Sequence, residues 1–203
     1  TAEQAPTNDP HEFLPFVATQ ALGASYATAQ GAEREVIDQA IHDAACDRRW
    51  RLHDAAALAL QRIGQQDWAA LEPLVTGLAE DESLLAARAA LVALAHPPLL
   101  EQDDPARCAL ALANQLFERF AALSTAERKA SAGQVLHKAL RFAPSVIVAA
   151  APVEGFAMLS RWASSEDLDL KRIVAANLRK ARLARHFPDE VEDVGATLSE
   201  SWD

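Results

Sequence analysis

Hydrophobic residues recur at intervals of three and four along most of the chain, which is the spacing that places them on one face of an α-helix. Alanine and leucine dominate, only 7 of the 203 residues are glycine, and no segment alternates as a strand does. Such a composition favours helix, because these side chains lose little freedom there. The pattern predicts an all-α chain of about eleven helices. They are expected near 10–22, 32–46, 48–63, 67–79, 83–96, 105–122, 125–142, 144–151, 153–164, 167–184 and 188–200.

Capping signals support several of these boundaries. Asp9 precedes Pro10, an acid followed by proline at the first helical position, and Asp104 precedes Pro105 in the same way. Ser124 is followed three residues later by glutamate, the spacing of a capping box. Gly64 and the Pro97-Pro98 pair are expected to end helices.

Three segments of the chain are similar to one another. Segment 81–94 aligns with 47–60 at an offset of 34, and segment 165–178 aligns at an offset of 118, with leucine and alanine at shared positions. Each copy follows another amphipathic helix, so the repeating unit is a helical hairpin that must stack on a neighbour to bury its apolar face.

The repeat predicts an α-solenoid of antiparallel hairpins, about four units with end caps, within one domain at 10–203. Residues 1–9 are expected to be a polar tail, helix 10–22 one cap and helix 188–200 the other. The four units are expected near 32–64, 67–97, 105–151 and 153–185.

The first repeated segment resembles the second helix of a HEAT repeat. Its pattern is Asp47-x-x-Trp50-x-Leu52-x-x-Ala55-x-Ala57-x-Ala59-Leu60, but the arginine usual in the family is His53 here, Ala86 or Ala87 in the second copy and Lys171 in the third. Segment 162–183 resembles the last repeat of uncharacterised bacterial HEAT-repeat proteins and, more loosely, DNA alkylation repair glycosylases.

This resemblance covers about 32–185 and implies a right-handed superhelix. It further implies a non-enzymatic scaffold that binds a protein or peptide in a concave groove. The looser similarity implies the alternative, a DNA-binding or lesion-recognising protein. A third reading, an accessory subunit of a modifying enzyme, depends on fold analogy alone.

Charge and apolar patterning narrow the classes of partner. The formal net charge of −10 argues against a nucleic-acid or membrane footprint over the whole surface. The longest apolar stretch, 142–153, is 12 residues long and contains two prolines, whereas a spanning helix needs about 20 apolar residues. Residues 1–9 do not resemble a secretory signal, and Cys46 and Cys108 show no pairing pattern. We therefore expect a cytoplasmic protein with no membrane partner.

The sequence contains none of the common catalytic or metal-binding motifs, so we expect no catalytic residue, no metal and no cofactor. There is no phosphate-binding glycine loop, no His-Glu-x-x-His and no Cys-x-x-Cys. His42 and Cys46 lie four residues apart and could share a helix face, but two ligands do not complete a metal site. The acidic pairs at 103–104, 189–190 and 192–193 are explained by the positive ends of helix dipoles.

The four tryptophans are expected to differ in role. Trp50, Trp68 and Trp162 fall at helix ends, where a large ring can close the seam between hairpins, so core packing is the simplest interpretation. Trp202 lies near the end of the chain and is expected to be exposed.

Basic residues recur at equivalent positions of the copies. One set of equivalent positions holds Arg88 and Arg172, with Asp54 in the first copy, and a second holds Arg62, His96 and Lys180. Positions 171–185 hold six of the 19 basic residues. Stacked copies would align these positions into a basic strip suited to an anionic protein or peptide, with nucleic acid as the less favoured partner. The expected partner-binding residues are Arg62, Arg88, His96, Lys138, Arg141, Lys171, Arg172, Arg179 and Lys180. The other interpretation is a solvated helix whose charges follow its dipole, and the sequence leaves both open.

Overall fold

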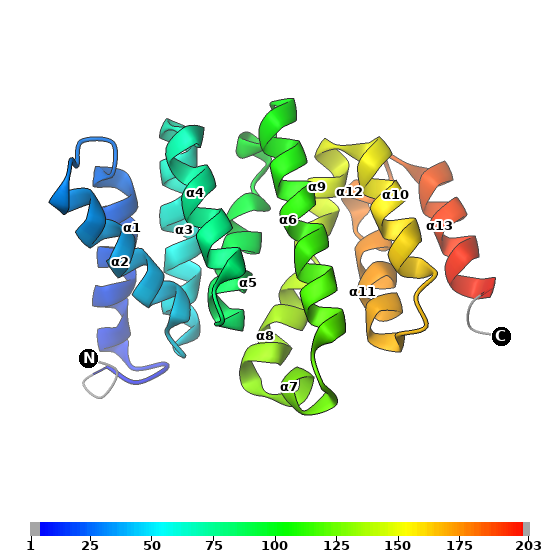
Figure 1. Cartoon of the computed structure of the whole chain (residues 1–203), viewed down its shortest axis with the longest axis horizontal. Coiled ribbons are helices and arrows are strands. Elements are labelled where there is room, and N and C mark those ends of the chain that lie inside the picture. Colours follow the sequence, from blue (N-terminus) through cyan, green and yellow to red (C-terminus); the bar gives the residue numbers. More distant parts are fainter. Residues whose placement is uncertain (1–4, 201–203) are drawn as a thin grey trace. The chain divides into compact units, whose positions relative to one another are not determined.

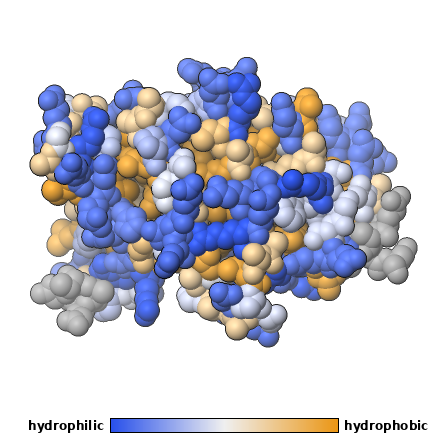
Figure 2. All heavy atoms as spheres, viewed as in Figure 1, coloured by the Kyte–Doolittle hydropathy of each residue, from blue (hydrophilic) through white to orange (hydrophobic). Residues whose placement is uncertain are grey.

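The computed structural model describes residues 5–200, and every regular element in that range is helical (Figure 1). The all-α prediction is therefore confirmed. The chain divides into two compact units, Thr1–Leu94 and Ala95–Asp203. Within residues 5–200, no helix combines the length and the hydrophobicity needed to cross a bilayer. On the face shown in Figure 2, hydrophilic residues are interspersed with smaller hydrophobic patches.

Unit 1 is organised around one central helix. Its elements are η1 (Pro10–Glu12), α1 (Phe13–Ser25), α2 (Ala32–Cys46), α3 (Trp50–Gln66), α4 (Trp68–Glu80) and α5 (Leu84–Leu94). Helix α3 packs against each of the other four α-helices of this unit. Its alanines at 55, 56, 57 and 59 are buried, so neighbouring backbones can approach it closely. Because α3 is surrounded on several sides, its small residues determine how tightly unit 1 packs.

The first two repeated segments lie side by side within unit 1. Helices α3 and α5, which carry the copies at 47–60 and 81–94, pack against each other. Gln61 of α3 donates from Nε2 to the carbonyl of Val92 on α5 at 3.2 Å. Arg88 and Asp54, which are equivalent positions at the offset of 34, form an ion pair of 2.5 Å. The two aligned segments are thus in direct contact in this unit.

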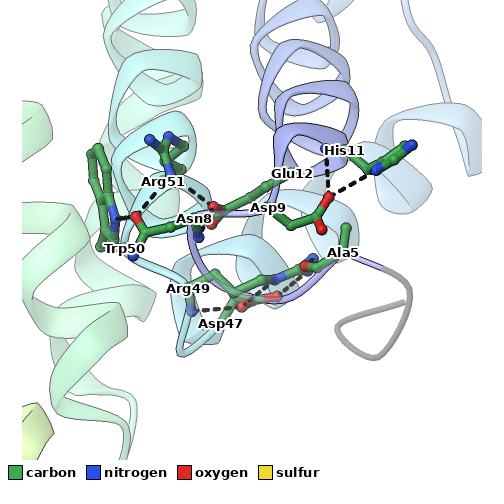
Figure 3. Close-up of polar contacts among 9 residues, drawn as sticks. All are labelled: Ala5, Asn8, Asp9, His11, Glu12, Asp47, Arg49, Trp50 and Arg51. Atoms are coloured by element: carbon green, nitrogen blue, oxygen red, sulfur yellow. Dashed lines mark hydrogen bonds and ion pairs between the residues drawn. The ribbon is translucent and has the colours of Figure 1, made fainter.

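The segment before η1 is attached to the start of α3 (Figure 3). Arg49 donates to the carbonyl of Ala5 at 3.0 Å, and Ala5 is buried. The fully buried Glu12 accepts bonds of 2.9 Å from the backbone N–H of Asn8 and from Arg51. Residues 5–9 of the predicted polar tail 1–9 are therefore attached to unit 1 by these contacts, and residues 1–4 lie outside the described residues.

Unit 2 also has a central helix. Its elements are η2 (Pro97–Leu99), α6 (Asp103–Ala122), α7 (Thr125–Lys129), α8 (Ser131–Leu140), α9 (Ala143–Ala150), α10 (Pro152–Ala163), α11 (Leu168–Leu178), α12 (Ala181–Ala184) and α13 (Pro188–Glu200). Helix α9 packs against α6, α8, α10, α11 and α12. The largest fully buried side chains of unit 2 include Phe117, Phe120, Leu136 and Ile147. The apolar helix α9 is therefore the core element of this unit.

Two predicted long helices are each divided in the structure. The predicted helix 125–142 breaks at Ala130, which is extended with ψ 154° and separates α7 from α8. The close approach at Gly133 accommodates this turn, because an added Cβ there would lie 2.1 Å from the carbonyl oxygen of Glu127. The predicted helix 167–184 ends at Leu178, and Lys180 is extended with ψ 132°. The break allows Leu183 to be fully buried while α12 packs on α9.

Capping predictions were correct at two of three starts. Asp9 accepts a bond from the N–H of His11, and Ser124 forms the expected capping box with Glu127. Helix α6 begins at Asp103, so Asp104 lies inside its first turn instead of capping it. Gly64 does not end α3, which continues to Gln66, and Asp67 instead caps α4. One internal glycine costs about 1 kcal/mol, which the packing of α3 offsets.

Candidate anion-binding site

Three arginines that were predicted to bind a partner surround one small cavity in unit 2. The cavity has a volume of about 210 Å³, and its lining residues are His137, Arg141, Arg172, Ala175 and Arg179. His137 and Arg141 come from the end of α8, and the other three from α11 and its C-terminal end. Among the described residues that line it there are three guanidinium groups and no carboxylate. We call this cavity the arginine pocket.

Two helix ends explain why arginines gather here. Arg141 is the C-cap residue of α8, and Arg179 is the C-cap residue of α11. The negative end of a helix dipole stabilises a nearby cation, so each arginine is favoured at its position by local electrostatics. Both side chains remain exposed to solvent. The solvated-helix interpretation thus accounts for the position of each arginine, but it does not account for their convergence on one cavity.

A buried asparagine holds the two sides of the arginine pocket together. Asn177 of α11 is fully buried, and its Nδ2 donates to the carbonyl of Leu140 on α8 at 2.8 Å. The same nitrogen donates to Ile173 at 2.9 Å, while Oδ1 accepts from the N–H of Ser145 on α9 at 2.9 Å. The Asn177 side chain therefore fixes the α8–α9 corner against α11. A pocket built in this way is formed before any ligand arrives.

A second link joins α7 to the start of α11. Arg128 forms an ion pair of 2.6 Å with Asp167, and its guanidinium lies 4.8 Å from the centre of the Phe120 ring. Burial alone would raise the pKa of the Asp167 carboxyl, but the bond from Arg128 and backbone N–H bonds hold that pKa below its usual value. Asp167 is thus ionised at neutral pH and caps α11 by accepting from Asp169 and Leu170.

The side chains in the arginine pocket differ in their availability to a ligand. Arg172 is 59% exposed and pairs with Asp169 at 3.2 Å, and such exposed pairs contribute at most about 1 kcal/mol. His137 stacks on Phe120 with ring centres 5.3 Å apart. Burial and the nearby Arg141 lower the pKa of His137, so its ring is neutral at pH 7. Its buried Nε2 has no hydrogen-bond partner among the described residues.

The other predicted binding residues are placed differently. Lys171 is only 3% exposed and does not line the arginine pocket, so it is not accessible to a partner in this structure. Lys138 is exposed on α8 and Lys180 is half-buried between α11 and α12, but neither lines the pocket. His96 is half-buried just before η2. The density of basic residues along 171–185 predicted these positions, but it does not distinguish side chains that are buried from those exposed to a partner.

In unit 1 the predicted binding residues have other surroundings. Arg88 is used in the ion pair with Asp54 and is 13% exposed. Arg62 is exposed near the end of α3. Neither belongs to the arginine pocket, which is formed entirely by residues of unit 2.

The tryptophans divide between packing and surface roles. Trp162 stacks on the buried Phe117 at 5.4 Å and donates from Nε1 to Asn114 at 3.0 Å, as expected for a ring that closes a helical seam. Trp68 is half-buried. The core-packing prediction is wrong for Trp50, which is 46% exposed and bonded to Asn8. Trp202 lies outside the described residues.

Sequence reasoning missed three residues that shape possible sites. His137 and Asn177 carry no local motif, because their roles depend on contacts between α8, α9 and α11. Asp81, at the end of α4, comes within hydrogen-bonding distance of His42, 39 residues away in the chain. A repeat alignment could have placed Asp81 near α2, since it is equivalent to Asp47 at the offset of 34, but not its contact with His42.

Comparison with known proteins gives no assignment. No protein-family model, no curated protein and no solved structure matches this chain.

Proposed function

We propose that this protein is a non-enzymatic interaction module that captures an anionic group of a protein or peptide partner in the arginine pocket. The observation that carries the proposal is the convergence of Arg141, Arg172 and Arg179 on one cavity whose described lining contains no carboxylate. Guanidinium groups bind carboxylates through paired, charge-assisted hydrogen bonds, and several around one cavity add specificity as well as affinity.

The size of the arginine pocket suits a single acidic group. A volume of about 210 Å³ is below the range of drug-sized ligand sites, which begins at about 300 Å³. An aspartate or glutamate side chain or a C-terminal carboxylate fits this description, with neutral His137 as a further hydrogen-bonding group. The Asn177 bonds supply the rigidity that such recognition requires.

We further propose that the fold is a HEAT-like solenoid of helical hairpins. The pairs α2–α3 and α4–α5, with α3 packed on α5, support the proposal for unit 1. In unit 2, α10 packs on α11, the helix that carries the third repeated segment. A concave surface for the partner follows from this fold proposal and from the resemblance together. Cys46 and Cys108 form no disulfide, which is compatible with a cytoplasmic setting.

Charge favours a protein partner over nucleic acid. The net charge of −10 opposes association with a phosphate backbone, and Asp169, which does not line the pocket, pairs with Arg172 at its edge. Three arginines around one cavity suit one anionic group better than the extended row of phosphates that DNA presents.

The test compares a fluorescent acidic peptide, such as oligoglutamate, with plain duplex DNA in anisotropy titrations at low and moderate salt. We expect saturable binding of the peptide, weakened at least tenfold by Arg172→Glu with Arg179→Glu. The matched control is Arg48→Glu with Arg185→Glu, which reverses two exposed arginines outside the pocket and should keep most of the affinity. Circular dichroism checks that both variants fold.

Two outcomes would reject the proposal. Equal loss in both double variants would mean that only net charge matters. DNA binding that exceeds peptide binding and falls steeply with salt would favour the alternative, a nucleic-acid-binding protein of the alkylation-repair type. Affinity capture from the native host lysate, with the same two double variants, then identifies the partner as a protein that is lost with the pocket variant alone.

A further inference from the structure

Three potential metal ligands of different chemical types meet in unit 1. His42 and Cys46 lie one turn apart at the end of α2, and Asp81 follows α4. His42 Nε2 lies 2.8 Å from Asp81 Oδ2 and 4.0 Å from Cys46 Sγ. The three ligand atoms all lie within 4.8 Å of one another. The cluster is distinct from the arginine pocket, which is formed by residues of unit 2.

The backbone around Asp81 orients its carboxylate toward α2. Asp81 is the C-cap residue of α4 and has an extended ψ of 146°. Its Oδ1 accepts a 2.7 Å bond from the N–H of Ser83, which fixes the carboxylate and directs Oδ2 to His42. Metal-ligating carboxylates usually have such a supporting hydrogen bond. The geometry of Asp81 therefore does not depend on the His42 contact alone.

The ligand types indicate which metal suits the site. A thiolate, an imidazole and a carboxylate together suit zinc, which accepts sulfur, nitrogen and oxygen ligands in tetrahedral geometry. Ligand bonds of about 2.0–2.3 Å in a tetrahedron place neighbouring ligand atoms about 3.3–3.6 Å apart. The observed separations of 2.8 and 4.0 Å each differ from these values by about half an ångström. The third separation, between Cys46 Sγ and the Asp81 carboxylate, is within 4.8 Å, so these side chains must rotate inward to bind an ion.

The cluster is also reachable from solvent. The His42 side chain is 42% exposed and the Asp81 side chain 27%, so an ion can enter without opening the unit. The Asp43 carboxylate lies 3.8 Å from the other ring nitrogen of His42 and adds negative charge nearby. Burial holds the pKa of the Cys46 thiol above its usual value, so a binding cation must displace a proton from this sulfur into solvent.

We propose that His42 Nε2, Cys46 Sγ and Asp81 Oδ2 bind one Zn²⁺ ion, with water as the fourth ligand. Three protein ligands and one open position are the usual arrangement of a zinc site that can receive a further ligand. The bound ion would join the end of α2 to the turn between α4 and α5 and so connect the two hairpins of unit 1. The proposal is independent of partner capture in the arginine pocket.

Cobalt(II) is the probe for the test, because its thiolate complexes absorb in the near ultraviolet and its tetrahedral complexes absorb in the visible. The full-length chain, reduced and freed of metal, is titrated with Co²⁺ alone. We expect a thiolate-to-cobalt band that saturates at one ion per chain and disappears when Zn²⁺ is added. Cys46→Ser should abolish the band, and Asp81→Asn, which keeps an oxygen able to accept from Ser83, should weaken Co²⁺ binding at least tenfold.

Cys108→Ser is the matched control, because Cys108 is also a half-buried cysteine outside any disulfide but lies in α6 of unit 2. This variant should keep the band and the affinity. Circular dichroism of each variant without metal separates loss of binding from loss of folding. Absence of a saturable band in the wild-type chain, or a band that persists in Cys46→Ser, would overturn the proposal and leave His42 and Asp81 as a hydrogen-bonded pair.

Discussion

Arg88 Nη2 lies 2.5 Å from a carboxylate oxygen of Asp54, and the two residues occupy equivalent positions of segments that the sequence aligns at an offset of 34. Equivalent positions therefore meet across the α3–α5 contact, which the proposed stacking of hairpins requires. The pair also explains why Arg88 does not contribute a free positive charge to the basic strip that the sequence predicted. The charge of Arg88 is neutralised by Asp54, which lies 34 positions earlier in the chain.

The Arg88–Asp54 pair should contribute measurably to the stability of unit 1. Arg88 is 13% exposed and Asp54 is 36% exposed, so the pair is only partly screened by water. We expect Arg88→Asp to lower the free energy of unfolding by about 1–3 kcal/mol, because two carboxylates then face each other. Adding Asp54→Arg should recover part of this loss. Urea denaturation of the two single variants and the double variant gives the coupling energy, and additive effects would mean that the pair contributes nothing.

The contact of α1 with α3 should be intolerant of any side chain at Gly23. An added Cβ would lie 2.5 Å from the backbone carbonyl oxygen of Ala59, so one helix would have to move. We expect Gly23→Ala to destabilise the protein by about 1–3 kcal/mol. Gly77→Ala is the control, since no described atom lies within 4 Å of its added Cβ. In that helix it should stabilise by about 0.5–1 kcal/mol. Thermal unfolding of both variants measures these two changes in stability, which should have opposite signs. No change in stability for Gly23→Ala would contradict the packing argument.

Local sequence signals predicted most helices because their causes are local. The capping box at Ser124 and the acid at Asp9 act within one turn, and both are present in the structure. The breaks at Ala130 and Lys180 could not be predicted in this way. They arise because Gly133 permits a close approach and Leu183 is buried on α9, contacts that no window of sequence contains.

The candidate sites show the same division between local and distant causes. Charge density along 171–185 drew attention to Arg172 and Arg179, which line one cavity, but also to Lys171, which is buried. The contribution of α8 to the same cavity depends on Asn177, whose partners Leu140 and Ser145 are more than thirty residues away. Spacing identified His42 and Cys46 as a pair, and only the fold adds Asp81.

The stability of the protein should fall between pH 7 and pH 5 because of His53. This side chain is 4% exposed, and burial, with a contribution from Arg88, lowers its pKa from 6.5 to about 4. The unfolded chain takes up a proton below pH 6.5 whereas the folded chain does not, so stability is fully present above this pH and is lost toward pH 4. The expected loss from pH 7 to pH 5 is about 2 kcal/mol, from a slope of about 1.4 kcal/mol per pH unit.

His53→Gln should remove most of this pH dependence, while the half-buried His137 retains a smaller part of it. His186→Gln, at an exposed position after α12, is the control and should behave as the wild type. Urea denaturation at several pH values between 5 and 7 makes the comparison. Parallel stability curves for wild type and His53→Gln would show that His53 is not the group responsible.

Removal of the Asn177 amide should cost more than removal of any exposed amide in the chain. Its three bonds are fully buried, so Asn177→Ala leaves the carbonyl of Leu140 and the N–H of Ser145 without their partner. We expect a loss of about 2–4 kcal/mol in the free energy of unfolding, measured by urea denaturation. Gln115→Ala, an exposed amide on α6, should change stability by less than about 0.5 kcal/mol.

The same substitution connects stability with the arginine pocket. Because Asn177 joins α11 to the α8–α9 corner, its loss should allow Arg141 to move relative to Arg172 and Arg179. Folded Asn177→Ala protein, examined below its denaturation midpoint, should therefore bind the acidic peptide more weakly although all three arginines remain. Unchanged peptide affinity in that variant would mean that the pocket does not depend on this buried amide, and unchanged stability would mean that water replaces its bonds.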